Sequence, residues 1–150
     1  MEVKMKAKEV TENLQNLTAL VAERKKFPGQ LMLAVTRSIK ILRSEGETIQ
    51  ESNEALIKEF SAIDENGLPK KEDFKMEVNG TVETLQKAVF KDKKAEIEYG
   101  ERYKELMNST LDLTLPRIAW DAIEECQESE ESRLDTIDML RLDFLIECQE

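Results

Sequence analysis

Apolar residues recur along the first 21 positions in alternating steps of three and four, which is the spacing of one face of an α-helix. The residues on this face are Val3, Ala7, Val10, Leu14, Leu17 and Val21. The segment Phe27-Pro28-Gly29 then interrupts the pattern, and Pro28 suits the first turn of a new helix. The pattern therefore predicts a first helix of about 22 residues that ends before this segment.

A second apolar stripe keeps a period of seven over four heptads, and no proline interrupts it. One seam position is occupied by Val35, Leu42, Ile49, Leu56 and Ile63, and the other by Ile39, Gly46, Asn53 and Phe60. This period is typical of helices that pack as in a coiled coil, so we predict a helix of about 35 residues over 28–63. It should run antiparallel to the first helix and form a long helical hairpin with it. Asn53 either pairs across the seam or lies at its edge in partial contact with water.

The two predicted helices differ in length, so the second should extend beyond the first. At 1.5 Å per residue they span roughly 33 Å and 50 Å. The distal residues Ile49, Leu56, Phe60 and Ile63 would then lack a neighbour, and leaving each in water would forgo roughly 1.5–3 kcal/mol. We expect the C-terminal half of the chain, a second copy or a target protein to cover them.

The middle of the chain changes from a helical to an alternating pattern. Asp64-Glu65-Asn66-Gly67 is typical of a turn. Apolar residues then alternate with charged ones up to Asn79-Gly80, which predicts a β-hairpin at about 74–85. A helix at about 92–108 should follow, with Asp92 as its N-cap.

The end of the chain predicts a short strand and two more helices. Alternating leucines at 111–115 indicate a strand, which we expect to join the 74–85 hairpin because a single strand is not stable alone. A short helix is expected around Trp120–Cys126 and a final helix at about 134–148. Its core-facing residues are expected to be Leu134, Ile137, Leu140 (or Met139), Phe144, Leu145 and Cys148.

The predicted fold class is therefore α+β, mainly α. An N-terminal long antiparallel helical hairpin (1–64) should precede a C-terminal module (65–150) of a small antiparallel β-sheet and two to three helices, the whole forming one compact domain. Cys126 and Cys148 form no metal-binding or redox motif, and we expect reduced thiols in or near a core, with a disulfide between them as the alternative.

The negative charge is concentrated near the C-terminus. Of 150 residues with a net charge of −10, positions 121–150 hold eleven acids against Arg133 and Arg141. Such a surface repels free nucleic acid and favours basic partners. Acids such as Glu124, Glu125, Glu128 and Glu131 would form part of a ridge that mimics a nucleic-acid backbone, or else a solvated face that keeps the protein soluble.

The sequence offers little for catalysis. It contains no histidine, so His-based general base catalysis and His-ligated metal sites are excluded. The glycine-rich phosphate-binding motifs, the serine nucleophile elbow and the metalloprotease motif are also absent. We predict no enzyme, no cofactor and no metal site, with a carboxylate-based divalent-metal hydrolase as the weaker alternative. We also expect no membrane segment, because the longest apolar run is only Leu31–Val35.

Several stretches carry a family resemblance. They are Glu2-Val3-Lys4-Met5-Lys6, Phe27-Pro28-Gly29-Gln30-Leu31 with Ile39-Lys40-Ile41-Leu42, Ala55–Phe60 leading to Asp64-Glu65-Asn66-Gly67, and Glu105-Leu106-Met107-Asn108 before the leucine strand. In this order they resemble small uncharacterised proteins of tailed bacteriophages and prophages of Gram-positive bacteria. The sequence departs from that pattern at 80–95 and in its acidic end. The resemblance implies a phage gene product in the host cytoplasm or the virion, and it assigns no functional residues.

We therefore expect a non-enzymatic phage protein that binds another protein, for example one that inhibits a host defence or nucleic-acid-handling protein. A virion structural or assembly protein that self-associates through the heptad seam is the alternative. Trp120 is expected to anchor the core of the C-terminal module, or otherwise an interface. The candidate partner-binding residues are Ile49, Leu56, Phe60, Ile63, Trp120, Glu124, Glu128, Glu130 and Glu131.

Overall fold

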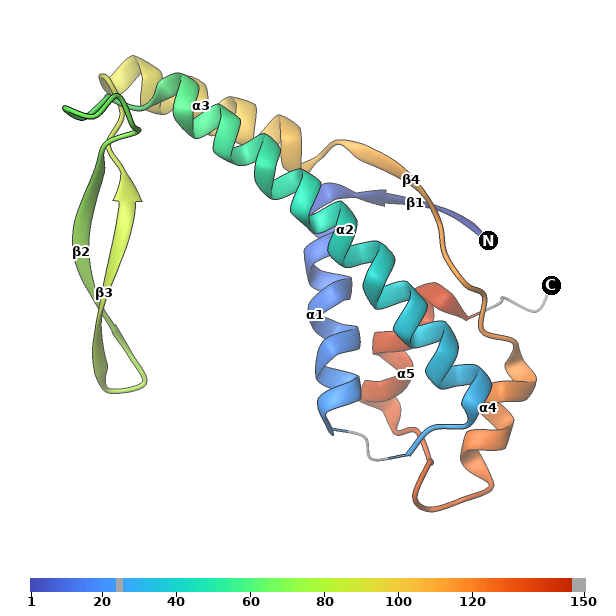
Figure 1. Cartoon of the computed structure of the whole chain (residues 1–150). Coiled ribbons are helices and arrows are strands. Elements are labelled where there is room, and N and C mark those ends of the chain that lie inside the picture. The colour runs from blue at the N-terminus through green and yellow to red at the C-terminus, as the bar shows by residue number, and fades with distance from the viewer. Residues whose placement is uncertain (24–25, 147–150) are drawn as a thin grey trace. The chain divides into compact units, whose positions relative to one another are not determined.

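The computed structural model describes residues 1–23 and 26–146, and the protein is α+β and mainly helical, as predicted (Figure 1). It consists of two compact units. Unit 1 comprises Met1–Thr48 and Asn108–Glu150, and unit 2 comprises Ile49–Met107. The long helix α2 (Gly29–Phe60) contributes its first part to unit 1 and its last part to unit 2.

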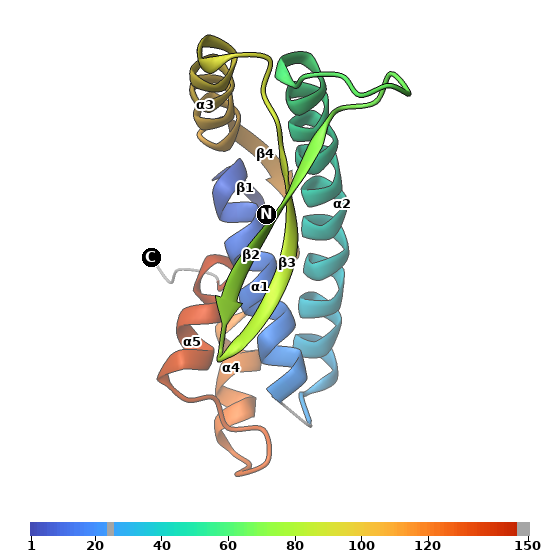
Figure 2. The same ribbon diagram turned by 90° about the vertical axis from the view of Figure 1, so that its left-hand side faces the viewer.

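The predicted helical hairpin is present at the N-terminus. Helix α1 (Ala7–Glu23) lies beside the first part of α2, and Figures 1 and 2 show that the chain reverses direction between them. The 32 residues of α2 match the range predicted from the heptad pattern to within three residues at each end. Ser38 on α2 is buried, and its hydroxyl donates to the carbonyl oxygen of Ala34, which satisfies it inside the helix.

The prediction that the first helix begins at Val3 is wrong. Residues Glu2–Lys6 form strand β1, and the helix begins at Ala7. The error arises because Val3 and Met5 also alternate with charged residues, so the segment fits a strand as well as a helix. The backbone N–H of Lys6 donates to the Glu9 carboxylate at 2.7 Å, which satisfies one donor where the helix starts.

The core of unit 1 joins both N-terminal helices to the C-terminal segments. The predicted residues Ala7, Val10 and Leu17 of α1 are buried, Leu14 and Val21 are only partly buried, and Leu20, which was not predicted, is fully buried. The fully buried large side chains are Val10, Leu17, Leu20, Leu31, Val35, Leu42, Leu115, Ile118, Ile123, Cys126, Leu142 and Leu145.

Strand β4 (Thr110–Thr114) confirms the strand predicted from the alternating leucines, but its predicted partner is wrong. It pairs antiparallel with β1, with Leu113 opposite Val3 and Leu111 opposite Met5. The 74–85 hairpin forms a separate sheet. Because the N-terminal segment was assigned to a helix, the strand that pairs with β4 was not recognised from the sequence.

The C-terminal part of unit 1 contains α4 (Trp120–Gln127), as predicted, and a shorter last helix than expected. Helix α5 spans Thr136–Leu142 and is followed by the 3₁₀ turn η1 (Asp143–Leu145). Asp135 and Asp138 form a capping box that sets the start of α5.

The face predicted for the last helix is partly wrong. Leu134 and Leu145 are buried, and Phe144 and Met139 are partly buried. Ile137 and Leu140, however, are exposed. The prediction assumed one long helix, whereas the short α5 is followed by a turn that rotates Leu145 into the core. Cys148 lies outside the described residues, and so does its expected relation to the buried Cys126.

Unit 2 contains the predicted hairpin and helix. Strands β2 (Lys71–Val78) and β3 (Thr81–Ala88) pair antiparallel through Asn79-Gly80, whose φ angles of 52° and 79° are those of a type I′ turn. Helix α3 (Lys93–Met107) begins as predicted at Asp92, whose carboxylate accepts the N–H of Ala95 at 2.7 Å.

Candidate protein-binding surfaces

The distal stripe of α2 is less open than the helix lengths predicted. Ile49, a candidate partner-binding residue, is only 7% exposed, so its side chain is already covered within this chain. Leu56 and Phe60 are partly buried. Ile63 lies beyond the end of the helix, pairs in a β-bridge with Pro69, and is 63% exposed.

Helix α3 and the segment before it contact this part of α2 within unit 2. The Tyr99 hydroxyl donates to Asn53 Oδ1 at 2.8 Å, and the rings of Phe90 and Tyr99 lie with their centroids 5.0 Å apart. The N–H of Lys91 donates to the Phe60 carbonyl at 3.1 Å. The sequence left three possibilities for what covers the distal residues of α2: the C-terminal half of the chain, a second copy or a target protein. The structure shows the first of these, the C-terminal half of the chain. Asn53 pairs across to another helix.

The ring cluster also changes the acidity of Tyr99. Burial raises the pKa of its phenol, the neighbouring phenol of Tyr103 adds to the rise, and the hydrogen bond to Asn53 opposes it. The two tyrosine rings lie 5.9 Å apart between centroids. Tyr99 is therefore neutral at physiological pH and acts as a packing and hydrogen-bonding residue.

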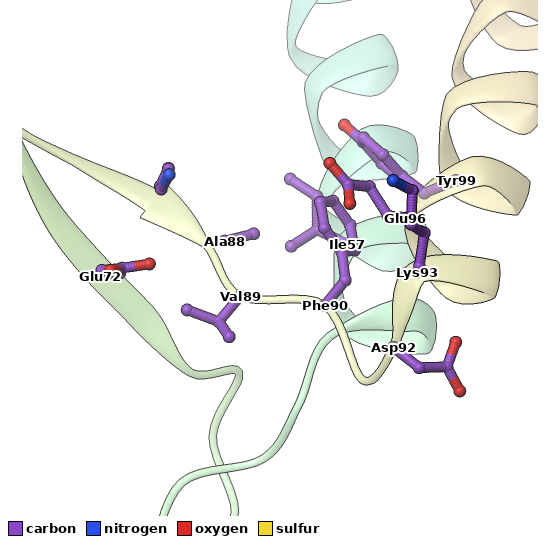
Figure 3. Close-up of a pocket in the computed structure, with 10 residues that line it drawn as sticks. Ile57, Glu72, Ala88, Val89, Phe90, Asp92, Lys93, Glu96 and Tyr99 are labelled. Atoms are coloured by element: carbon purple, nitrogen blue, oxygen red, sulfur yellow. The ribbon is translucent and has the colours of Figure 1, made fainter.

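A cavity of about 510 Å³ opens beside this cluster (Figure 3). Ile57, Phe90 and Tyr99 form its apolar wall, where Figure 3 shows their side chains close together. Charged side chains of both signs complete the lining, among them Glu96 and Lys93. In residues 1–23 and 26–146, no three Asp, Glu, Cys or His side chains gather as metal ligands. The mixed lining favours no particular ligand class.

One face of the hairpin of β2 and β3, here called the ribbon, carries four apolar residues among charged ones. Because directly opposed residues share a face of the sheet, the register places Phe74 opposite Leu85, with Met76 and Val78 on the same face. Met76 is 45% exposed, and Leu85 is also exposed. We call these four residues the ribbon face. Within the described part of the chain, the ribbon pairs with no third strand.

The ribbon face was not among the candidate surfaces predicted from the sequence. The alternation of apolar residues at 74–78 predicted the strand correctly, and the leucine strand was then expected to complete the sheet. Because β4 pairs with β1 instead, the hairpin remains two-stranded, and Met76 and Leu85 of its apolar alternation remain exposed. A small cluster of exposed apolar residues on α5, Ile137 and Leu140, was missed because both were assigned to the core.

The acidic candidates lie on α4 and the segment that follows it, in unit 1, and all four are exposed. Glu128 and Glu131 line one cavity of about 360 Å³ together with Lys26 and Glu125. Glu124 and Glu130 do not line that cavity. The structure thus brings together two of the four predicted acids, and it places a cation among them.

Lys26 reduces the negative charge of this surface. Its Nζ lies 2.7 Å from Oε2 of Glu131. The hydrogen bond from the ammonium lowers the pKa of the Glu131 carboxyl, and the same contact raises the pKa of Lys26. Both side chains are well exposed, so the pair is screened by solvent.

Trp120 does not anchor the core in the way expected. It is 38% exposed at the start of α4, and its indole N–H donates to Glu124 Oε1 at 3.1 Å. The alternative interpretation, an interface anchor, stays a prediction.

Across residues 1–23 and 26–146, none of the helices combines the length and the apolar character needed to cross a bilayer. Comparisons of the chain with family models, with curated proteins and with solved structures find no match.

Proposed function

We propose that this protein acts by binding another protein stoichiometrically, without a chemical step of its own. The observation that supports this proposal is the ribbon face, where Phe74, Met76, Val78 and Leu85 share one side of a two-stranded sheet and Met76 and Leu85 remain exposed. A two-stranded hairpin is marginally stable alone in water, and packing against another surface stabilises it. A partner that covers the ribbon face would supply that packing.

The charge of the chain adds a preference among partners. A net charge of −10 speeds encounters with positively charged proteins and slows those with nucleic acid. With the resemblance to phage proteins, this supports a host protein of basic surface, such as a defence or nucleic-acid-handling protein, as the target, and the host cytoplasm as the place of action.

Affinity capture with matched variants tests the proposal. The wild-type protein is used as bait in a lysate of a Gram-positive host, and captured proteins are identified by mass spectrometry. Met76→Ser with Leu85→Ser should lose the captured protein, whereas Val82→Ser, on the opposite face of the ribbon, should retain it. Equal capture by all three baits, or a wild-type protein that stays alone at micromolar concentration, would contradict the proposal.

A charge variant separates the ribbon face from the acidic surface. Glu130→Lys with Glu131→Lys changes exposed side chains, so the fold should remain intact. If capture is unchanged, the acids serve solubility. If it falls sharply while the ribbon variants still bind, the acidic surface is the binding site and mimicry of nucleic acid is favoured over the proposal made here.

The second candidate function is a virion structural or assembly protein. The observation in its favour is that neither β2 nor β3 pairs with a further strand among residues 1–23 and 26–146, and open strand edges join subunits readily. Mass spectrometry of purified particles distinguishes the two, because a structural subunit should be present in many copies and an inhibitor should be absent.

A further inference from the structure

Charges of alternating sign occupy every second position of β2. They are Lys71, Asp73, Lys75 and Glu77, and all four side chains are exposed. The ladder places them opposite four uncharged residues of β3, which are Ala88, Gln86, Thr84 and Val82. The cross-strand position that usually supplies an opposite charge is therefore neutral for each of them.

The same four residues carry the open backbone edge of β2. A two-residue type I′ turn is closed by a hydrogen-bonded pair, here Val78 and Thr81, and bonded pairs then alternate with non-bonded ones. At the base of the ribbon the Val89 N–H donates to the Lys70 carbonyl at 3.0 Å, in agreement with this alternation. Even-numbered residues of β2 thus bond to β3, and odd-numbered residues direct their N–H and C=O groups outward.

We propose that a second copy of this chain pairs with this edge, β2 against β2 and antiparallel, with Phe74 of one copy opposite Phe74 of the other. In this register Asp73 lies opposite Lys75, and Lys71 lies opposite Glu77. Two-fold symmetry repeats each pair, so four opposite-charge pairs form on one face of the new sheet. The paired residues are all odd-numbered, so the outward N–H and C=O groups of both copies meet.

The charge pattern selects this register against its neighbours. Sliding one strand by two residues in one direction places Lys75 opposite Lys75 and Asp73 opposite Glu77. Sliding it in the other direction places Asp73 opposite Asp73 and Lys71 opposite Lys75. Like charges directly opposite each other destabilise a sheet, so only the central register satisfies both unique pairs.

The edge of β3 has no such pattern. Its outward-directed residues are Val82, Thr84, Gln86 and Ala88, none of which is charged. Pairing through β2 would join two marginal ribbons into a four-stranded sheet, which is the size that becomes stable with one apolar face. It would also bring the two Phe74 side chains together and make the ribbon faces of the two copies continuous. This self-association goes beyond the proposed binding of another protein and does not depend on it.

Sedimentation velocity of the purified full chain over a range of concentrations tests the proposal without any other protein. The wild type should show a dimer fraction that rises with concentration. Lys75→Pro removes an outward N–H of β2 and should leave a monomer. Thr84→Pro is the matched control, because it sits directly opposite Lys75 but on the other edge, and it should still dimerise.

A charge swap tests the register. Asp73→Lys should weaken the dimer by about tenfold, because it replaces two attractive pairs with two repulsive ones by symmetry. Adding Lys75→Asp to that variant restores opposite charges and should restore the dimer. A wild type that stays monomeric, equal effects of both prolines, or no rescue by the double swap would overturn the proposal. Amide exchange across β3 in each monomeric variant shows whether its ribbon is still formed.

Discussion

The two parts of α2 share one heptad pattern and differ in what covers them. In the first part, the seam residues Val35 and Leu42 are fully buried in the core of unit 1. In the last part, Leu56 and Phe60 are only partly buried against α3 and the segment before it. A seven-residue period therefore specifies a helix and the face it buries, but not how completely that face is buried.

The same difference holds for the units as wholes. Of the buried apolar residues in the described part of the chain, only Ile49 and Ala95 belong to unit 2. Unit 2 also contributes most of the exposed large apolar residues, including those of the ribbon face. Few buried contacts mean low local stability, and exposed apolar residues are typical of a binding surface. We therefore expect unit 1 to be the stable frame and unit 2 the region that makes contacts.

The same substitution, leucine to alanine, made at two positions of α2 should give the largest difference in the free energy of unfolding. Leu42→Ala leaves a cavity in the core of unit 1 and should lower the free energy of unfolding by about 2–5 kcal/mol. Leu56→Ala, two heptads later, should cost clearly less because its side chain is already partly exposed. Urea denaturation followed by circular dichroism measures both. Equal losses would mean that the distal part of α2 is as tightly packed as the first.

A substitution in the turn of the ribbon tests whether unit 2 can lose stability while unit 1 keeps its own. Gly80 has a φ of 79°, where a side chain costs about 1–2 kcal/mol. Gly80→Ala should therefore speed amide exchange in β2 and β3 and leave the exchange of α1 unchanged. Faster exchange in both regions would show that the units unfold together.

The contact between α2 and α3 should contribute less. Tyr99→Phe removes the hydrogen bond to Asn53 and keeps the ring, so it should lower stability by about 0.5–1.5 kcal/mol. Tyr103→Phe, on the same helix and more exposed, is the control and should have almost no effect. If the two variants are equally stable, the hydrogen bond to Asn53 contributes nothing.

The smallest effect is expected at the surface pair of Lys26 and Glu131. Because Lys26 lowers the pKa of Glu131, its contribution is present above the unfolded-state pKa and disappears as the pH falls through the folded-state pKa. The raised pKa of Lys26 acts in the opposite sense, and its contribution disappears as the pH rises through that pKa. Since both groups are exposed, Glu131→Gln should leave the melting temperature near neutral pH unchanged within error. A clear fall in the melting temperature near neutral pH would contradict this expectation, because it would show that the ion pair stabilises the fold more than such an exposed pair should.

Local signals in the sequence predicted the long helix, the hairpin, α3 with its Asp92 cap, and α4, because each depends on residues a few positions apart. The pairing of β1 with β4 could not be predicted in the same way, since it joins residues more than a hundred positions apart. That one omission had two consequences. It made Val3 appear helical, and it assigned to the ribbon a third strand that pairs with β1 instead.

The candidate surfaces could likewise be predicted from the sequence only where they depend on local signals. Exposure of the four glutamates followed from their charge, whereas burial of Ile49 and exposure of Ile137 depend on which distant segment packs nearby. The contact of Lys26 with Glu131 links positions 105 residues apart. The alternating charges of β2 were visible in the sequence. That they lie on the open edge of β2, opposite uncharged residues, became clear only from the register with β3.

Amide exchange at residue resolution, measured at low and high protein concentration, tests most directly whether the β2 edge of unit 2 is a contact surface. We expect the amides of Lys71, Asp73, Lys75 and Glu77 to become more protected as concentration rises, whereas those of Val82, Thr84 and Gln86 should keep the same exchange rates. Rates on β2 that do not depend on concentration, or protection that appears on β3 instead, would contradict it.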